Sequence, residues 1–293
     1  MCKLLNGGFI DKNGRTDDEI IIEFAKALTV DHNAKKMLGN VNWRYITGFS
    51  DSSDPVLRLI ASGHAKKVFD LALPFIAEGH EPQAALCNDL YDGKLIVLNS
   101  EFEDSVSFID RGRFPNQYRS YAVAGTGHVP DHLVVPSPAS GSTPASFSPE
   151  LRAHFLQGDD WVMGRKKMPL STHLKRSDNG RIKRDINGNA ITVNAAMKPL
   201  SRLPFIELGE AHFITGFIGS YEDVKNINEL GFKNHHAYVK VFKDKLHDYI
   251  KAGYILKNDA DDMLRRATLC PKLTFTETYR DHYDNFIAIV SCV

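Results

Sequence analysis

Four short apolar runs, separated by stretches long enough for helices, constrain the fold of this chain more than any other feature. The runs cover residues 43–47, 68–76, 95–98 and 118–124. Strands that alternate with helix-length segments are typical of a mostly parallel sheet flanked by helices. The second and third runs are predominantly apolar, as strands buried on both faces usually are. The sequence therefore predicts an α/β fold.

Helix signals accompany these runs. Thr16 followed by Glu19 forms a capping-box pattern ahead of an amphipathic stretch that ends near residue 28. Pro55 suits the first turn of a helix directly after the first apolar run. Further helices are expected over residues 148–163 with Ser148 as cap, from Ser220 onward, over 236–252, and over 258–266 with Asn258 as cap.

Two stretches read as irregular or hairpin structure. Residues 1–15 are polar and rich in glycine, so they are expected to form a loop. Asn179-Gly180 and Asn187-Gly188 are strong turn signals that bracket a charged stretch, which predicts a surface hairpin. The basic residues of this stretch are expected to be solvated: Lys175, Arg176, Arg181, Lys183 and Arg184.

A segment rich in Pro, Ser, Gly and Thr, residues 136–149, is the best candidate for a boundary. It divides the chain into two expected parts. Residues 16–135 would form the α/β core, and residues 148–293 a C-terminal helical region packed on that core.

Composition and charge exclude several functions. The chain has 36 Lys and Arg and 36 Asp and Glu, so no global basic field attracts nucleic acid or a membrane surface. No run approaches the roughly 20 apolar residues of a membrane-spanning helix. The four cysteines, Cys2, Cys87, Cys270 and Cys292, form no C-x-x-C pair of the kind found in zinc ribbons. We therefore expect a cytoplasmic chain without metal or cofactor.

The clearest chemical motif is the sequence Gly48-Phe49-Ser50-Asp51-Ser52, between an expected strand and an expected helix. This is the setting of a nucleophile elbow, a strained turn that lifts a serine hydroxyl above a sheet. Gly48 and Ser52 supply the small residues that such a turn requires on either side. At the helix N-terminus the amide of Asp51 could donate to an oxyanion. The alternative interpretation is an ordinary capped helix start.

A serine nucleophile needs a base, and the base needs a carboxylate that fixes its tautomer. Acidic residues follow the run at 95–98, at positions 101, 103 and 104, and His128 follows the run at 118–124. The order serine, acid, histidine, with each residue at a strand end, is that of α/β-hydrolases. Taken singly, the acidic residues could form a solvated loop and His128 could be a loop histidine without a role.

These motifs resemble those of the α/β-hydrolase domain-containing proteins, whose elbow reads roughly G-x-S-Q-S-G. In that family a T-E-x-D-like motif supplies the acid and an E-V-A-G-T-x-H-like motif the histidine. This chain has Ala122-Val123-Ala124-Gly125-Thr126-Gly127-His128, a close match to the latter. Later segments also match, and together the resemblance covers most of the chain from about residue 16: residues 149–161, 185–190, 203–204, 215–216 and 238–260.

The resemblance implies Ser50 as nucleophile, His128 as base and Glu103 as acid, with Glu101 and Asp104 as alternatives for the acid. Two departures concern the elbow: Asp51 stands where the family has Gln, and Ser53 where it has Gly. A carboxylate at position 51 places negative charge near the oxyanion, which is unfavourable unless it points away.

A third departure concerns the start of the fold. Only 47 residues precede Gly48, whereas the family has several strands there, including the loop expected to give a second oxyanion donor. We therefore expect a partial α/β-hydrolase fold with an exposed sheet edge, which a partner chain or oligomer could cover.

Two functional hypotheses follow. The first is a serine hydrolase that cleaves a small ester-like acyl substrate without a cofactor. The alternative is a catalytically inactive fragment or binding remnant of an α/β-hydrolase.

Overall fold

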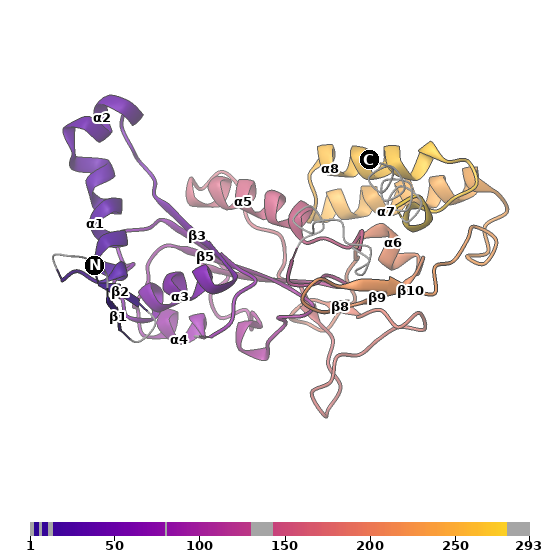
Figure 1. The fold of residues 1–293 in the computed structure, drawn as a ribbon, viewed down its shortest axis with the longest axis horizontal. Helices are drawn as coiled ribbons and strands as arrows, with labels where there is room; N and C mark the ends of the chain where they lie inside the picture. The colour runs from indigo at the N-terminus through magenta and orange to yellow at the C-terminus, as the bar shows by residue number, and fades with distance from the viewer. Residues whose placement is uncertain (1–2, 6–7, 11–13, 80, 130–142, 280–293) are drawn as a thin grey trace.

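A four-stranded parallel sheet forms the centre of the computed structural model, which describes residues 3–5, 8–10, 14–79, 81–129 and 143–279. Its strands follow one another in the order of the chain: β3 (Tyr45–Phe49), β4 (Leu71–Phe75), β5 (Lys94–Ser100) and β6 (Tyr118–Val123). All three pairs of neighbours are parallel. The four predicted strands and the predicted α/β class are therefore confirmed. Figure 1 shows the sheet with helices on both sides.

Helices cover both faces of this sheet because its side chains alternate between two apolar cores. On one face, Ala72, Leu95 and Val97 pack in a cluster with α3 (Ser53–Ala61) and α4 (Pro82–Cys87). On the other, strand residues that include Leu73 and Leu98 share a cluster with Trp161 of α5 (Ser148–Val162). This alternation is the period of two expected for strands buried on both sides.

The C-terminal part packs on the α5 face of the sheet. It contains α6 (Pro204–Glu207), α7 (His235–Ala252) and α8 (Lys257–Leu269), and four short strands: β7 (His173–Leu174), β8 (Thr192–Val193), β9 (His212–Ile214) and β10 (Ser220–Glu222). Phe242 and Ala260 of α7 and α8 belong to the same buried cluster as Leu73 and Leu98. Thr172 also forms a parallel bridge with Tyr121, which extends the sheet beyond β6.

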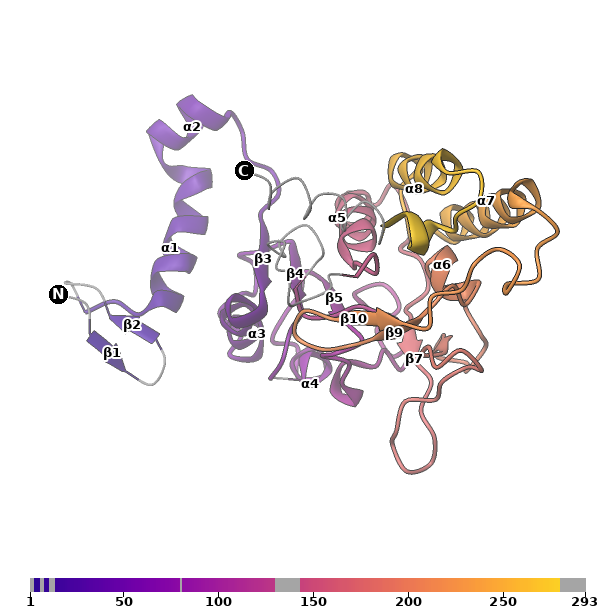
Figure 2. The same cartoon turned by 45° about the vertical axis from the view of Figure 1, so that its right-hand side comes forward.

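The N-terminal part contains a short antiparallel hairpin and two helices: β1 (Lys3–Leu5), β2 (Gly8–Ile10), α1 (Asp17–Val30) and α2 (His32–Leu38). Thr16 and Glu19 form the expected capping box of α1. The expectation of a loop over residues 1–15 was wrong, because an Asn-Gly pair between two apolar runs is a hairpin signal. Figures 1 and 2 show α1 and α2 beyond the β3 edge of the sheet.

Other predictions for the C-terminal part met mixed outcomes. Ser220 begins β10 instead of a helix, because Tyr221 pairs with Phe213 of β9 and this pairing overrides the local helix signal. Helix α7 ends at Gly253 as expected. Phe147 and Leu256, instead of Ser148 and Asn258, occupy the N-cap positions of α5 and α8. The predicted hairpin is two successive turns, with bridges between residues 176 and 182 and between 184 and 190.

Two expectations stay predictions. Residues 130–142, which include half of the predicted boundary at 136–149, lie outside the described residues, so the division into residues 16–135 and 148–293 is not tested. Strand β3 pairs with β4 alone among the described strands. A partner that covers its other edge is still an expectation. Within the described ranges, none of the helices combines the length and the apolarity needed to cross a membrane.

Candidate active site

The backbone around Ser50 makes a strained turn between β3 and α3. Strand β3 ends at Phe49, and the 3-10 turn η1 (Ser50–Ser52) follows directly. The φ angle of Ser50 is +54°, in the left-handed region that residues other than glycine seldom adopt. Such strain persists only where surrounding contacts enforce it, and it clusters at functional sites. The turn therefore has the geometry of an elbow.

Gly48 and Ser52 hold this turn in different ways. A Cβ atom on Gly48 would lie 2.0 Å from the carbonyl oxygen of Ser52, so no larger residue fits there without moving the turn. Ser52 Oγ donates to the carbonyl oxygen of Phe49 at 2.7 Å and accepts from the Phe49 amide at 2.8 Å. The requirement for a small residue explains Gly48, but the bridging role of Ser52 was not expected from the sequence.

The structure brings Ser50, His128 and Glu103 into one hydrogen-bonded chain. Ser50 Oγ lies 2.7 Å from His128 Nε2, and His128 Nδ1 lies 2.6 Å from Glu103 Oε1. The three residues follow the carboxyl ends of β3, β6 and β5 respectively. The carboxyl ends of parallel strands lie at the same edge of a sheet. Ser50 and Glu103 therefore meet His128 there, although they are 78 and 25 positions from it in the sequence.

The acidic loop after β5 gives each of its carboxylates a separate partner. Glu103 is buried, and its second oxygen accepts a hydrogen bond from Ser100 Oγ. Glu101 Oε2 accepts from the amide of Gly125 at 2.7 Å, and Asp104 pairs with Arg176. Of the three carboxylates left open by the sequence, Glu103 is therefore the one in contact with the imidazole of His128.

Arginines from the segment expected to be solvated bind this acidic loop. Arg184 lies 2.7 Å from Glu101 Oε1, and Arg176 pairs with Asp104. Burial raises the pKa of Asp104, which the guanidinium of Arg176 opposes. The expectation of a wholly solvated basic cluster was therefore wrong for these two residues, because buried carboxylates require charged partners. The separation in the sequence, more than 70 residues, concealed the pairing.

The loop that carries His128 is fastened to the C-terminal part of the chain. The amide of His128 donates to the carbonyl oxygen of Gly216 at 3.1 Å, and the amide of Val129 to that of Phe217 at 2.9 Å. A Cβ atom on Gly127 would lie 2.6 Å from the Gly216 oxygen, so glycine permits this close approach. The ring of Phe217 stacks on His128 with centroids 4.6 Å apart. Nothing in the sequence marked Phe217.

A cleft of about 620 Å³ opens at Ser50 and His128. Its lining includes apolar groups and three acidic residues: Ser50, Asp51, Ser53, Asp54, Ile76, Glu78, Gly79, Phe102, His128 and Phe217. Asp51 directly follows the nucleophile candidate in η1, and its side chain is exposed. The cleft is therefore large enough for a small ligand and gives it access to the Ser50 hydroxyl.

Groups that could bind a metal ion lie elsewhere. In the part of the chain that the structure describes, His212, Glu222 and Asp223 offer ligand atoms within 4.8 Å of one another. They lie on or next to the β9–β10 hairpin, and none of them lines the cleft. His235 on α7 does not belong to this group, and its Nε2 lies at hydrogen-bond distance, 3.0 Å, from the carbonyl oxygen of Ala267. The expectation that the site needs no cofactor stays a prediction.

The parallel sheet, the strained elbow and the residues at its carboxyl edge define an α/β-hydrolase type of protein. A family model described as alpha/beta hydrolase domain matches residues 18–265. The chain therefore belongs to the alpha/beta hydrolase domain family, and this membership indicates hydrolase activity. Comparison with curated proteins and with solved structures gave no match.

Proposed function

We propose that this protein is a serine hydrolase that cleaves an ester-like acyl substrate. The observation that carries the proposal is the continuous hydrogen-bonded chain from Ser50 through His128 to Glu103, at the mouth of a cleft. Geometry of this kind, and not sequence position, is what characterises such triads. Family membership supports hydrolysis in general, and the three side chains support this particular chemistry.

The reaction would proceed in two halves. Ser50 Oγ attacks the ester carbonyl carbon while its proton passes to His128 Nε2, and a tetrahedral oxyanion forms. Collapse of this intermediate breaks the ester bond, and His128 returns the proton to the departing alcohol. Water then attacks the acyl-Ser50 ester, again giving a proton to His128. The second collapse releases the carboxylic acid and restores the hydroxyl of Ser50.

Two further residues support these steps. Glu103 would hold the Nδ1 proton of His128 and stabilise the imidazolium as it forms. The hydrogen bond from Ser100 Oγ to Glu103 keeps that carboxylate in position. The amide of Asp51 belongs to the first turn after the nucleophile, where backbone donors are not used within the helix, and it would donate to the oxyanion.

A fluorophosphonate probe tests the proposal, because it labels only activated serines. We expect a single adduct on Ser50, found by peptide mass spectrometry, and its loss in His128→Ala. His236→Ala is the matched control, since His236 is exposed on α7. Circular dichroism would verify that each variant folds. Absence of labelling in a folded wild-type sample would contradict the proposal and favour a non-catalytic binding remnant.

A further inference from the structure

The cleft beside Ser50 has an unbalanced charge. Asp51, Asp54 and Glu78 line it, and no Lys or Arg is among its described lining residues. Asp54 is paired with Arg58 at 3.0 Å, but the same guanidinium also binds two carboxylates of α1. Asp51 and Glu78 are exposed, and neither forms an ion pair within the described ranges. The described lining of the cleft therefore carries a net negative charge next to the serine hydroxyl.

Two phenylalanines face the same cleft and are unusually exposed for their size. Phe102 is 50% exposed and Phe217 is 61% exposed. The electron-rich face of an aromatic ring attracts a cation, and quaternary ammonium groups are bound in this way. Because Phe217 stacks on His128, a cation that contacts it would lie close to the reacting atoms.

The position of Asp51 poses an electrostatic problem that a cation would relieve. Its carboxylate belongs to the residue directly after the nucleophile, and negative charge near a developing oxyanion raises the barrier to its formation. A positive charge carried by the substrate offsets this cost where the charge develops. An anionic substrate, by contrast, would be repelled by both Asp51 and Glu78.

We propose that the cleft selects esters that carry a positive charge, such as an ammonium or quaternary ammonium group, on the portion next to the scissile bond. This inference rests on the proposed hydrolase function and adds the substrate class. Asp51 and Glu78 attract the cation, and the exposed rings of Phe102 and Phe217 contact its alkyl groups. The same carboxylates would also raise the association rate of cationic substrates at low ionic strength.

A pair of isosteric thioesters isolates the effect of charge. Butyrylthiocholine and S-(3,3-dimethylbutyl) thiobutyrate have the same shape, but the second has a neutral carbon in place of the ammonium nitrogen. We expect kcat/KM to be about tenfold or more higher for the cationic ester at low salt, because two carboxylates act on it across a partly solvated cleft. Added salt should reduce this ratio.

Charge-neutralising variants then assign the preference to residues. Glu78→Gln and Asp51→Asn should each lower the ratio about threefold to fivefold. Asp244→Asn is the matched control, because Asp244 is exposed on α7 and does not line the cleft. A ratio at or below one, or a ratio unchanged in both cleft variants, would overturn the inference.

A binding measurement separates failure of this inference from failure of the hydrolase proposal. Calorimetric titration of the Ser50→Ala protein with each thioester measures affinity without turnover. If neither ester is cleaved and Ser50 is not labelled, the hydrolase proposal fails. Stronger binding of the cationic ester would still support the charge preference, and equal binding of the two esters would refute it.

Discussion

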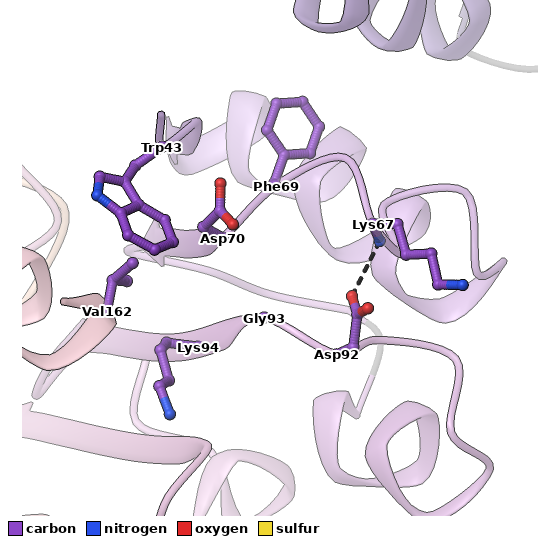
Figure 3. Close-up of a pocket in the computed structure, with 8 residues that line it drawn as sticks. All are labelled: Trp43, Lys67, Phe69, Asp70, Asp92, Gly93, Lys94 and Val162. Atoms are coloured by element: carbon purple, nitrogen blue, oxygen red, sulfur yellow. Dashed lines mark hydrogen bonds between the residues drawn. The ribbon is translucent and has the colours of Figure 1, made fainter. Parts of the chain in front are cut away.

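The two ends of the parallel sheet both carry polar pockets, but they use their charged residues differently. At the carboxyl end, Ser50, Glu103 and His128 meet beside a cleft of about 620 Å³. At the amino end lies a smaller pocket of about 210 Å³, and Figure 3 shows the side chains that line it. Its lining also mixes aromatic and charged residues: Trp43, Lys67, Phe69, Asp70, Asp92, Gly93, Lys94 and Val162.

At the amino end, three of the four charged side chains that line the pocket hold loops together. Asp70 accepts from the amide of Arg44 at 2.8 Å, and Asp92 from the amide of Lys67 at 2.9 Å. Lys94 Nζ donates to the carbonyl oxygen of Asn116 and lies 4.9 Å from the ring centroid of Trp161. At the carboxyl end, Asp51 and Glu78 have no such partners among the described residues. A pocket lined with charged residues is therefore not sufficient evidence of a site. Unpaired carboxylates beside Ser50, whose backbone is strained, are more informative.

The strongest test of this comparison is to substitute one residue at each end of the parallel sheet. Ser50→Ala should reduce ester hydrolysis about 10⁴-fold or more, since the proposed nucleophile is lost. Asp92→Asn at the amino end should change kcat/KM less than twofold. Steady-state kinetics on a chromogenic ester measures both. Equal losses in the two variants would mean that the ends do not differ in function.

The acidic loop allows a sharper comparison between neighbouring carboxylates. Glu103→Gln should lower kcat about 10³-fold, because an amide cannot hold the required tautomer of His128. Glu101→Gln should lower it far less, since Glu101 touches the Gly125 amide and Arg184 instead. The ratio of the two kcat values is the measurement. A larger loss of kcat in Glu101→Gln would contradict the proposal that Glu103 is the acid.

The strain at the elbow predicts an effect of a single methyl group. Gly48→Ala places a Cβ atom 2.0 Å from the Ser52 oxygen, so the turn must move, and we expect about a 100-fold loss of kcat. Gly164→Ala is the control, because nothing lies within 4 Å of its added Cβ atom and Gly164 does not line the cleft. Steady-state hydrolysis of the chromogenic ester measures kcat, and the rate at which the fluorophosphonate probe labels Ser50 reports separately on the reactivity of the serine. Normal labelling of Gly48→Ala would show that the elbow tolerates the shift.

The buried carboxyl group of Glu210 should make the free energy of unfolding depend on pH. This effect must be separated from any pH dependence of activity at the carboxyl end of the sheet. Burial raises the pKa of Glu210 to about 7, although hydrogen bonds from Thr276 and Tyr238 favour its charged form. The folded protein therefore holds a proton that the unfolded chain releases near pH 4.5.

The resulting stabilisation is complete below about pH 4.5 and is lost as pH rises to about 7. Urea unfolding should show a loss of about 2 to 3 kcal/mol over this interval in wild type relative to Glu210→Gln. Parallel pH dependence in the two proteins would contradict this assignment.

The smallest expected effect is at the amino end. Asp70→Ala removes the acceptor of the Arg44 amide and should lower the free energy of unfolding by about 1 kcal/mol. Ester hydrolysis should stay the same, because the residue lies at the opposite end of β4 from the elbow. If kcat fell more than twofold in a fully folded sample of Asp70→Ala, the pocket at the amino end of the sheet would contribute to hydrolysis, contrary to this prediction.

The sequence predicted correctly those helices and strands that depend on residues close together in the chain. The four parallel strands, the capped helix α1 and the end of α7 at Gly253 followed from apolar runs, capping residues and glycine. Residues 50, 103 and 128 could be nominated because the carboxyl ends of parallel strands converge, and the structure does bring them together. Their catalytic role stays a proposal.

The features that escaped prediction depend on contacts between distant residues. Ser220 carries a local helix signal, yet pairing of Tyr221 with Phe213 makes it part of a strand. Arg176 and Arg184 lie more than 70 residues from the carboxylates they neutralise, so their pairing left no local pattern. Phe217 supports His128 through a stacking contact that nothing in its immediate sequence announces.

The fastening of the His128 loop to residues 216 and 217 has a consequence for dissecting the chain. A recombinant piece that stopped near residue 135 would contain the serine, the carboxylate and the imidazole. It would nevertheless lack the carbonyl oxygens and the aromatic ring that fix the imidazole in place. The three side chains of the proposed triad thus come from the first half of the chain, whereas the groups that hold the His128 loop in place come from the second half.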